Sequence, residues 1–194
     1  IAEEVLLEIK SEFLEYKDKI TRKLEKSDSD MNEYMLRNLG NILPPLNFWD
    51  HTEKKLDPWQ LQILKNSNPK NDKSSIVLAP TASGKTFTAI GVCLLRRRVL
   101  YVVPTKPVAY QVAAQFQRMN IKYNLLVDNI ICKDYSNSKV VIGTPEYIER
   151  YLPIIGTDFD YAVFDEFHNI MKEDDGHIYE NLIKILNCNF LALS

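Results

Sequence analysis

From Ser75 onward the chain alternates short apolar runs with helical patterns, and this alternation restricts the fold more than any other feature. The continuous apolar runs indicate parallel strands buried on both faces, and the helical patterns between them predict an α/β domain in which helices flank the sheet. We expect strands at Ile76–Ala79, Val99–Val103, Tyr123–Val127, Val140–Gly143, Tyr161–Asp165 and Phe190–Leu193. We expect helices at Trp59–Leu64, Lys85–Leu95, Val108–Met119, Glu146–Tyr151 and Ile178–Leu186.

The segment APTASGKT lies between the first predicted strand and the helix that follows it. Ligands of such sheets bind outside the carboxyl ends of the strands, which makes this a candidate site. The segment fits the phosphate-loop pattern, with Ala79 in place of the usual first Gly and with Gly84, Lys85 and Thr86 at its end. The loop residues expected to surround the phosphates are Ala79, Pro80, Thr81, Ala82, Ser83 and Gly84. Backbone N–H groups and the positive end of the helix would hold phosphate oxygens, Lys85 would neutralise the outer phosphates, and the Thr86 hydroxyl would bind magnesium. The alternative is a structural strand–turn–helix made of small residues.

A second polar segment, Asp165-Glu166-Phe167-His168, follows the apolar run Tyr161–Phe164. A carboxylate at the tip of a strand beside a phosphate loop can hold magnesium, and a neighbouring carboxylate can orient or deprotonate an attacking water. We therefore expect Asp165 to take the metal role and Glu166 the role of base. For His168, a functional role and a simple capping or packing role both stay open.

The phosphate loop and the D-E-F-H segment together resemble motifs I and II of the superfamily 2 DExH-box helicases, and the Ski-two-like branch is the most similar. Smaller motifs of the first RecA-like domain follow in the same order. Leu56–Gln60 resembles the Q motif, Val103–Pro107 resembles motif Ia, Gly143–Glu146 resembles motif Ib, and Leu191–Ser194 looks like the start of motif III. The resemblance covers about Leu56 to Ser194.

This resemblance implies a RecA-like ATP-binding domain of an ATP-dependent nucleic-acid helicase, with RNA as the expected substrate and ATP and Mg²⁺ as cofactors. Gln60 would read the edge of the adenine, and Lys85, Asp165, Glu166 and His168 would be catalytic. Single-stranded RNA or DNA would contact motifs Ia and Ib, through Pro104, Thr105, Lys106, Gln111, Thr144, Pro145 and Glu146. Thr-Pro-Glu is also a common helix start, and Lys106 can be a solvated charge.

The resemblance also implies a second RecA-like domain that supplies arginine fingers, without which this piece is expected to hydrolyse ATP poorly. Two other functions stay open. One is a DNA translocase that does not separate strands, and the other is a non-catalytic nucleic-acid sensor.

The first part of the chain has a different pattern. Apolar residues at helical spacing, from Leu6 to Leu24, predict an amphipathic helix, and a second short helix is expected around Asn32 to Asn38. We therefore expect a helical appendage over residues 1–50 and the RecA-like domain over residues 51–194. The appendage serves a partner or an earlier domain, and the pattern does not choose between them.

Composition excludes several other classes of protein. The formal net charge of −2 argues against a highly basic nucleic-acid coat, although a local basic groove is compatible with it. The three cysteines are isolated, which predicts neither a zinc site nor a disulfide framework. No apolar run reaches the length of a membrane span, and we expect an intracellular protein, in the cytoplasm or nucleus. The richness in Asn, Lys and Ile is compatible with a viral source, and the first residue, Ile1, suggests a piece of a longer protein.

Overall fold

The structure is a computed structural model that describes residues 56–127, 137–172 and 176–194. The helices expected in residues 1–50, and the expected domain boundary beside them, lie outside these ranges.

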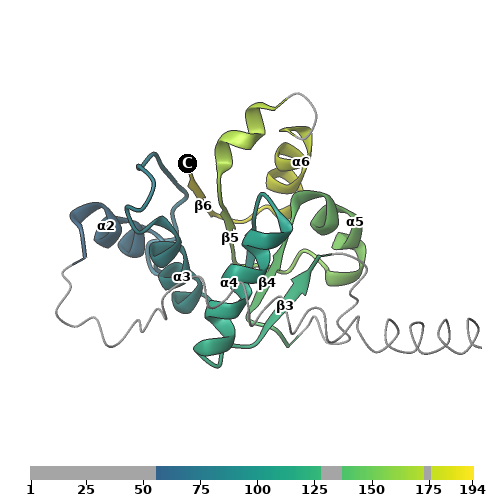
Figure 1. The fold of residues 1–194 in the computed structure, drawn as a ribbon, viewed down its shortest axis with the longest axis horizontal. Helices are drawn as coiled ribbons and strands as arrows, with labels where there is room; N and C mark the ends of the chain where they lie inside the picture. Colours follow the sequence, from purple (N-terminus) through teal and green to yellow (C-terminus); the bar gives the residue numbers. More distant parts are fainter. Residues whose placement is uncertain (1–55, 128–136, 173–175) are drawn as a thin grey trace, which may run out of the picture.

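A six-stranded parallel sheet forms the centre of the domain, as predicted (Figure 1). Its strand order is β1-β6-β5-β2-β4-β3, so the chain crosses between distant strands several times. The strands are β1 (Ser75–Val77), β2 (Val99–Val102), β3 (Tyr123–Leu126), β4 (Val140–Gly143), β5 (Tyr161–Phe164) and β6 (Phe190–Leu193). Four of them, β1, β2, β3 and β5, end one or two residues earlier than predicted.

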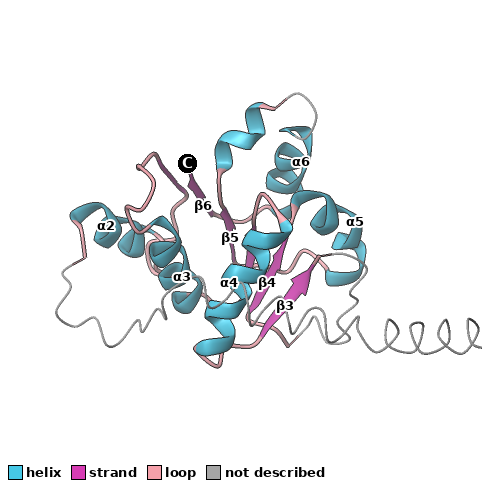
Figure 2. Ribbon diagram, in the orientation of Figure 1, coloured by secondary structure: helices cyan, strands magenta, loops and turns pink. Residues whose placement is uncertain are grey.

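Helices cover both faces of the sheet (Figure 2). One face packs against α2 (Pro58–Asn66), α3 (Lys85–Leu95) and α4 (Lys106–Arg118), and the other against α5 (Pro145–Ile155) and α6 (Gly176–Leu186). A 3₁₀ helix, η1 (Phe167–Met171), follows β5 and was not predicted. None of the helices in the described ranges combines the length and the apolar character needed to cross a bilayer.

Helix α5 is longer than the predicted Glu146–Tyr151 and continues through Pro153 to Ile155. Proline lacks an N–H group and usually ends a helix at the residue before it. Here Pro153 lies in the last turn of α5 and is exposed. It therefore removes only one hydrogen bond, close to the end of the helix. The helix stops at Gly156, whose φ of 73° is in the region that favours glycine.

At the amino edge of the sheet, buried polar contacts hold the loop that connects α2 with β1. Arg96 is 4% exposed, donates to the Ser67 carbonyl at 2.7 Å and to Asp72, and stacks over the Tyr161 ring at 4.3 Å. The Tyr161 hydroxyl donates to the Lys73 carbonyl at 2.9 Å and lies 3.1 Å from the Ser67 hydroxyl. These contacts fix the loop to the edge of the sheet opposite the polar motifs.

Candidate functional site

The phosphate-loop segment connects β1 to α3 at the carboxyl edge of the sheet. Lys85 is the first residue of α3, and its Nζ donates to the Ala79 carbonyl at 2.8 Å. The loop bends back on itself at Ala82 and Gly84, whose φ angles are 64° and 87°. The first N–H groups of a helix have no partner within the helix. The start of α3 therefore places backbone donors that the helix itself cannot pair beside an ammonium group, as a phosphate site requires.

Gln60 packs directly against this loop. A Cβ added at Gly84 would lie 2.6 Å from Gln60 Nε2, so only glycine fits there without moving that side chain. The amide oxygen of Gln60 accepts a hydrogen bond from the Asp57 backbone N–H at 2.9 Å, which caps α2. Gln60 is 7% exposed. The residue expected to read adenine is thus fixed between the start of α2 and the phosphate loop.

The acidic segment follows β5 at the same edge. Asp165 is 6% exposed, and its backbone N–H donates to the Val102 carbonyl at 2.9 Å, which continues the ladder by one residue. Glu166 adopts a left-handed conformation with φ 48°, and its side chain is 43% exposed. His168 Nδ1 lies 3.3 Å from Glu166 Oε2 and 3.3 Å from Ser194 Oγ. The histidine therefore connects the acidic segment with the tip of β6.

The environment of Asp165 opposes its ionisation. Burial raises the pKa of its carboxyl from 3.8 to about 6, and the nearby charge of Glu166 adds to this increase. The Glu166 backbone N–H, 3.0 Å from Asp165 Oδ1, and the Lys85 ammonium act in the opposite direction. Burial is the largest cause, so Asp165 is a carboxylate that a bound cation would stabilise strongly.

One cleft of about 530 Å³ brings the two segments together. Its wall includes Lys85, Asp165 and Glu166, so the ammonium group and the two carboxylates converge at one edge of the sheet as the sequence predicts. The cleft is lined by Thr81, Ala82, Gly84, Lys85, Thr86, Phe87, Val108, Gln111, Val112, Asp165 and Glu166.

The oxygen atoms in this cleft suit a magnesium ion. Mg²⁺ prefers hard oxygen ligands, keeps several waters, and is held in phosphate sites by one or two protein groups together with the phosphates. The Thr86 hydroxyl and the Asp165 carboxylate line the same cleft and supply such groups. Over the described ranges, no three or more His, Cys, Asp or Glu side chains are grouped to hold a metal ion by themselves.

The residues predicted to contact nucleic acid divide into two sets. Pro104 and Thr105 follow β2, and Thr144 follows β4, which is paired with β2. The first set also includes Lys106 and Pro145, which begin helices α4 and α5, and Glu146, which follows Pro145. Within this set Thr105, Lys106 and Glu146 are exposed. Gln111 does not join them, because one turn further along α4 it lines the cleft beside Asp165.

Two features of this edge were not predicted. The ring of Tyr147 has two cationic groups near it, with Lys106 Nζ 5.4 Å and the Arg150 guanidinium 5.6 Å from its centroid. Phe87, Val108 and Val112 form an apolar wall of the cleft. The helical spacing of Tyr147 and Arg150 could have indicated the first feature, but contacts between α4 and α5 cannot be read from spacing.

A model of the "DEAD/DEAH box helicase" family matches residues 57–194. The chain is 33% identical over 156 residues to a human protein named "Probable ATP-dependent RNA helicase DDX60-like", and the match covers 70% of this chain and 9% of that protein. It is 32% identical over 142 residues to the ATP-dependent DNA helicase Hel308 of Aeropyrum pernix, covering 68% of this chain and 19% of that one. The chain thus spans less than a fifth of either relative.

Among solved structures, the chain resembles the DEAD-box helicase Mss116 bound to single-stranded RNA and UDP-BeF. The TM-score is 0.61 at 21% sequence identity, and the match covers 72% of this chain and 35% of that chain. At this identity the likeness establishes the fold, a RecA-like parallel sheet flanked by helices.

Proposed function

The chain belongs to the DEAD/DEAH box helicase family, and on that premise we propose that it is the ATP-binding domain of an ATP-dependent RNA helicase. The convergence of Lys85, Asp165 and Glu166 on one cleft is the observation that supports this most strongly. An ammonium group beside a buried and an exposed carboxylate suits magnesium-assisted attack of water on a terminal phosphate.

The proposal assigns each residue a role that its position supports. Lys85 exchanges its hydrogen bond to Ala79 for the outer phosphates of ATP. Thr86 and Asp165 would hold a magnesium ion, which would supply positive charge beside the phosphates. Glu166, half exposed at the cleft, orients the water and accepts its proton, and the contact of His168 with Glu166 and Ser194 keeps that carboxylate in position. Gln60 holds the adenine edge against the phosphate loop.

Nucleic acid would lie along the edge formed by the starts of α4 and α5, where Thr105, Lys106, Thr144, Pro145 and Glu146 are located. Contacts there would be mainly to phosphates and sugars, which gives weak sequence preference and a marked dependence on salt. ATP would draw a second RecA-like domain over the strand, and hydrolysis would release it. An arginine finger from that domain would raise the rate by roughly 10³- to 10⁵-fold, so this chain alone hydrolyses ATP slowly.

The test is nucleic-acid-stimulated ATPase activity of the complete protein. Lys85→Ala and Glu166→Gln are expected to abolish it, whereas Lys184→Ala and Glu180→Gln, the same changes in an exposed ion pair on α6, leave it intact. Turnover that survives either cleft variant would refute the assignment.

One relative is named as a DNA helicase, so DNA is the second candidate substrate. Unwinding of matched RNA and DNA duplexes separates the two. ATP turnover on DNA without strand separation would indicate a translocase, and binding without any turnover would indicate a nucleic-acid sensor.

A further inference from the structure

Two buried polar side chains, one on β2 and one on α4, have polar atoms with no hydrogen-bond partner in the described part of the chain. Tyr101, on β2, is 0% exposed, and its hydroxyl is unpartnered. Gln115, on α4, is 1% exposed, and both its amide oxygen and its amide nitrogen are unpartnered. Buried groups of this kind are nearly always bonded to protein or to ordered water, so both residues indicate bound water.

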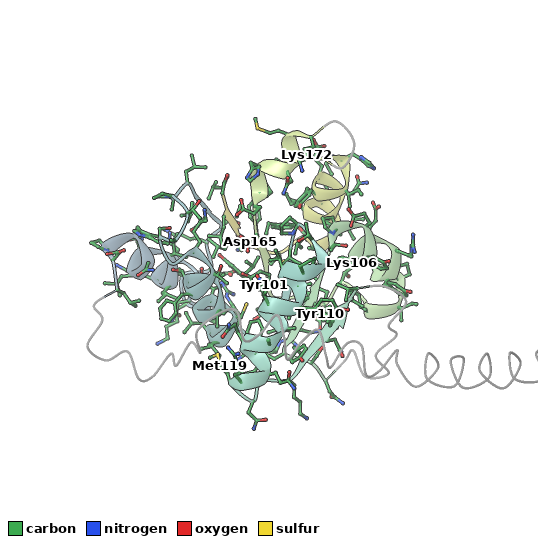
Figure 3. The ribbon with its side chains drawn as sticks, in the orientation of Figure 1. Tyr101, Lys106, Tyr110, Met119, Asp165 and Lys172 are labelled. Carbon is green, nitrogen blue, oxygen red and sulfur yellow. The ribbon has the colours of Figure 1, made fainter. Side chains whose placement is uncertain are left out.

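Tyr101 lies next to Asp165 on the sheet. Residue Tyr101 is paired with Val163 in the ladder between β2 and β5, and Asp165 is two residues beyond Val163. Residues two apart on a strand face the same side, so Tyr101 and Asp165 are diagonal neighbours on the face that carries α3 and α4. Figure 3 shows Tyr101 directly below Asp165 in this view. Burial is the main cause of the raised pKa of Tyr101, and the charge of Asp165 is the second, in agreement with this proximity.

Gln115 is the second buried polar residue, and it belongs to the helix α4. It follows Gln111 by one turn of α4, and residues four apart share a helix face. Gln111 lines the cleft together with Asp165, and Gln115 lies one turn further from the carboxyl edge on the same face of α4. Tyr101 from the sheet and Gln115 from the helix thus carry buried polar atoms without a protein partner on the side of the sheet that α4 covers.

A polar partner of this kind would orient the carboxylate of Asp165. Its Oδ1 accepts a hydrogen bond from the Glu166 backbone N–H at 3.0 Å, and the orientation of the other oxygen decides how the carboxylate faces a metal ion. Groups that orient a metal ligand are a recurrent part of metal sites.

We propose that Tyr101 is a positioning residue for Asp165: its hydroxyl and the Gln115 amide hold a buried water that donates a hydrogen bond to the Asp165 carboxylate. The inference rests on the proposed function, because it assumes that Asp165 binds magnesium. It differs from that function in assigning a role to two residues below the cleft that do not touch the nucleotide.

The experiment uses the 194-residue chain and a fluorescent ADP analogue, with affinity measured in EDTA and across a magnesium titration. Tyr101→Phe keeps the ring and removes only the hydroxyl. We expect it to raise the half-saturating magnesium concentration about tenfold, the effect of losing an outer-shell group, and to leave affinity in EDTA unchanged. Gln115→Met acts in the same direction.

Tyr161→Phe is the matched control, since it removes a buried hydroxyl from β5 at the opposite edge of the sheet. It lowers the melting temperature and leaves the magnesium dependence unchanged. Without nucleotide or magnesium, Tyr101→Phe also lowers the melting temperature, because a bridging hydrogen bond is lost.

Two results would overturn the role of Tyr101. One is an unchanged magnesium dependence in a Tyr101→Phe variant that binds the analogue. The other is a melting temperature that rises on removal of the hydroxyl, as expected for a group that was simply unpaired. A wild-type chain that binds no nucleotide at any magnesium concentration would refute the proposed function itself.

Discussion

Asp165→Asn is expected to stabilise the chain at pH 7 when neither magnesium nor nucleotide is present. Burial raises the pKa of this carboxyl from 3.8 to about 6, so keeping it charged opposes folding. One pKa unit corresponds to about 1.4 kcal/mol, which makes the opposing free energy about 3 kcal/mol at pH 7. Asparagine has the same shape and keeps an oxygen to accept the hydrogen bond from the Glu166 backbone N–H, while it removes the charge.

The stabilisation by Asp165→Asn depends on pH. Between pH 3.8 and about 6, folded Asp165 holds a proton that the unfolded chain has released, so wild-type stability falls as the pH rises through this window. Above this pH window the full cost of about 3 kcal/mol is present. Below it Asp165 is protonated in both the folded and the unfolded chain, and the cost disappears. The advantage of Asp165→Asn is therefore largest at pH 7 and absent below about pH 4.

Thermal unfolding in EDTA between pH 4 and pH 7 measures this advantage. For a chain of this size, about 3 kcal/mol corresponds to roughly 6–12 °C in melting temperature. Glu180→Gln on α6 is the control, because that side chain is 58% exposed and its charge lies outside the cleft. An Asp165→Asn variant that melts no higher than wild type at pH 7, or keeps its advantage at pH 4, would contradict the reasoning.

Three further predictions concern the loop, the amino edge and the nucleic-acid edge. Gly84→Ala places a Cβ 2.6 Å from Gln60 Nε2 at a φ of 87°, so it lowers nucleotide affinity and stability, and Gln60→Ala in a double-mutant cycle restores part of the loss. Arg96→Ala removes a buried guanidinium and lowers the free energy of unfolding, measured in urea, by about 3 kcal/mol. Arg97→Ala is the control, because the Arg97 side chain is 67% exposed and its loss changes that free energy by less than about 0.5 kcal/mol. Lys106→Ala weakens binding to all nucleic-acid sequences alike and reduces the slope of log affinity against log salt by about 1, and an unchanged slope would exclude a phosphate contact.

The pattern of apolar runs predicted most of this fold because buried parallel strands need continuous apolar sequence. Tyr161–Phe164 is the clearest example, since all four of its residues are buried. The helix η1 could not be predicted in the same way, because five residues at three per turn give no periodic apolar face.

The cleft could also be predicted in outline. Lys85 and Asp165 follow different strands of one parallel sheet, and the carboxyl ends of such strands meet at one edge, so their convergence follows from the motifs. The position of Gln111 could not be predicted, because it depends on how α4 is rotated about its axis. Tyr101 gave no sequence signal either, since an aromatic residue in a buried strand is ordinarily part of the core.

The contacts of Arg96 and Tyr161 lie at the opposite end of the strands from the phosphate loop and the acidic segment. A substitution of Arg96 or Tyr161 can therefore weaken the fold while every side chain that lines the cleft stays as it is.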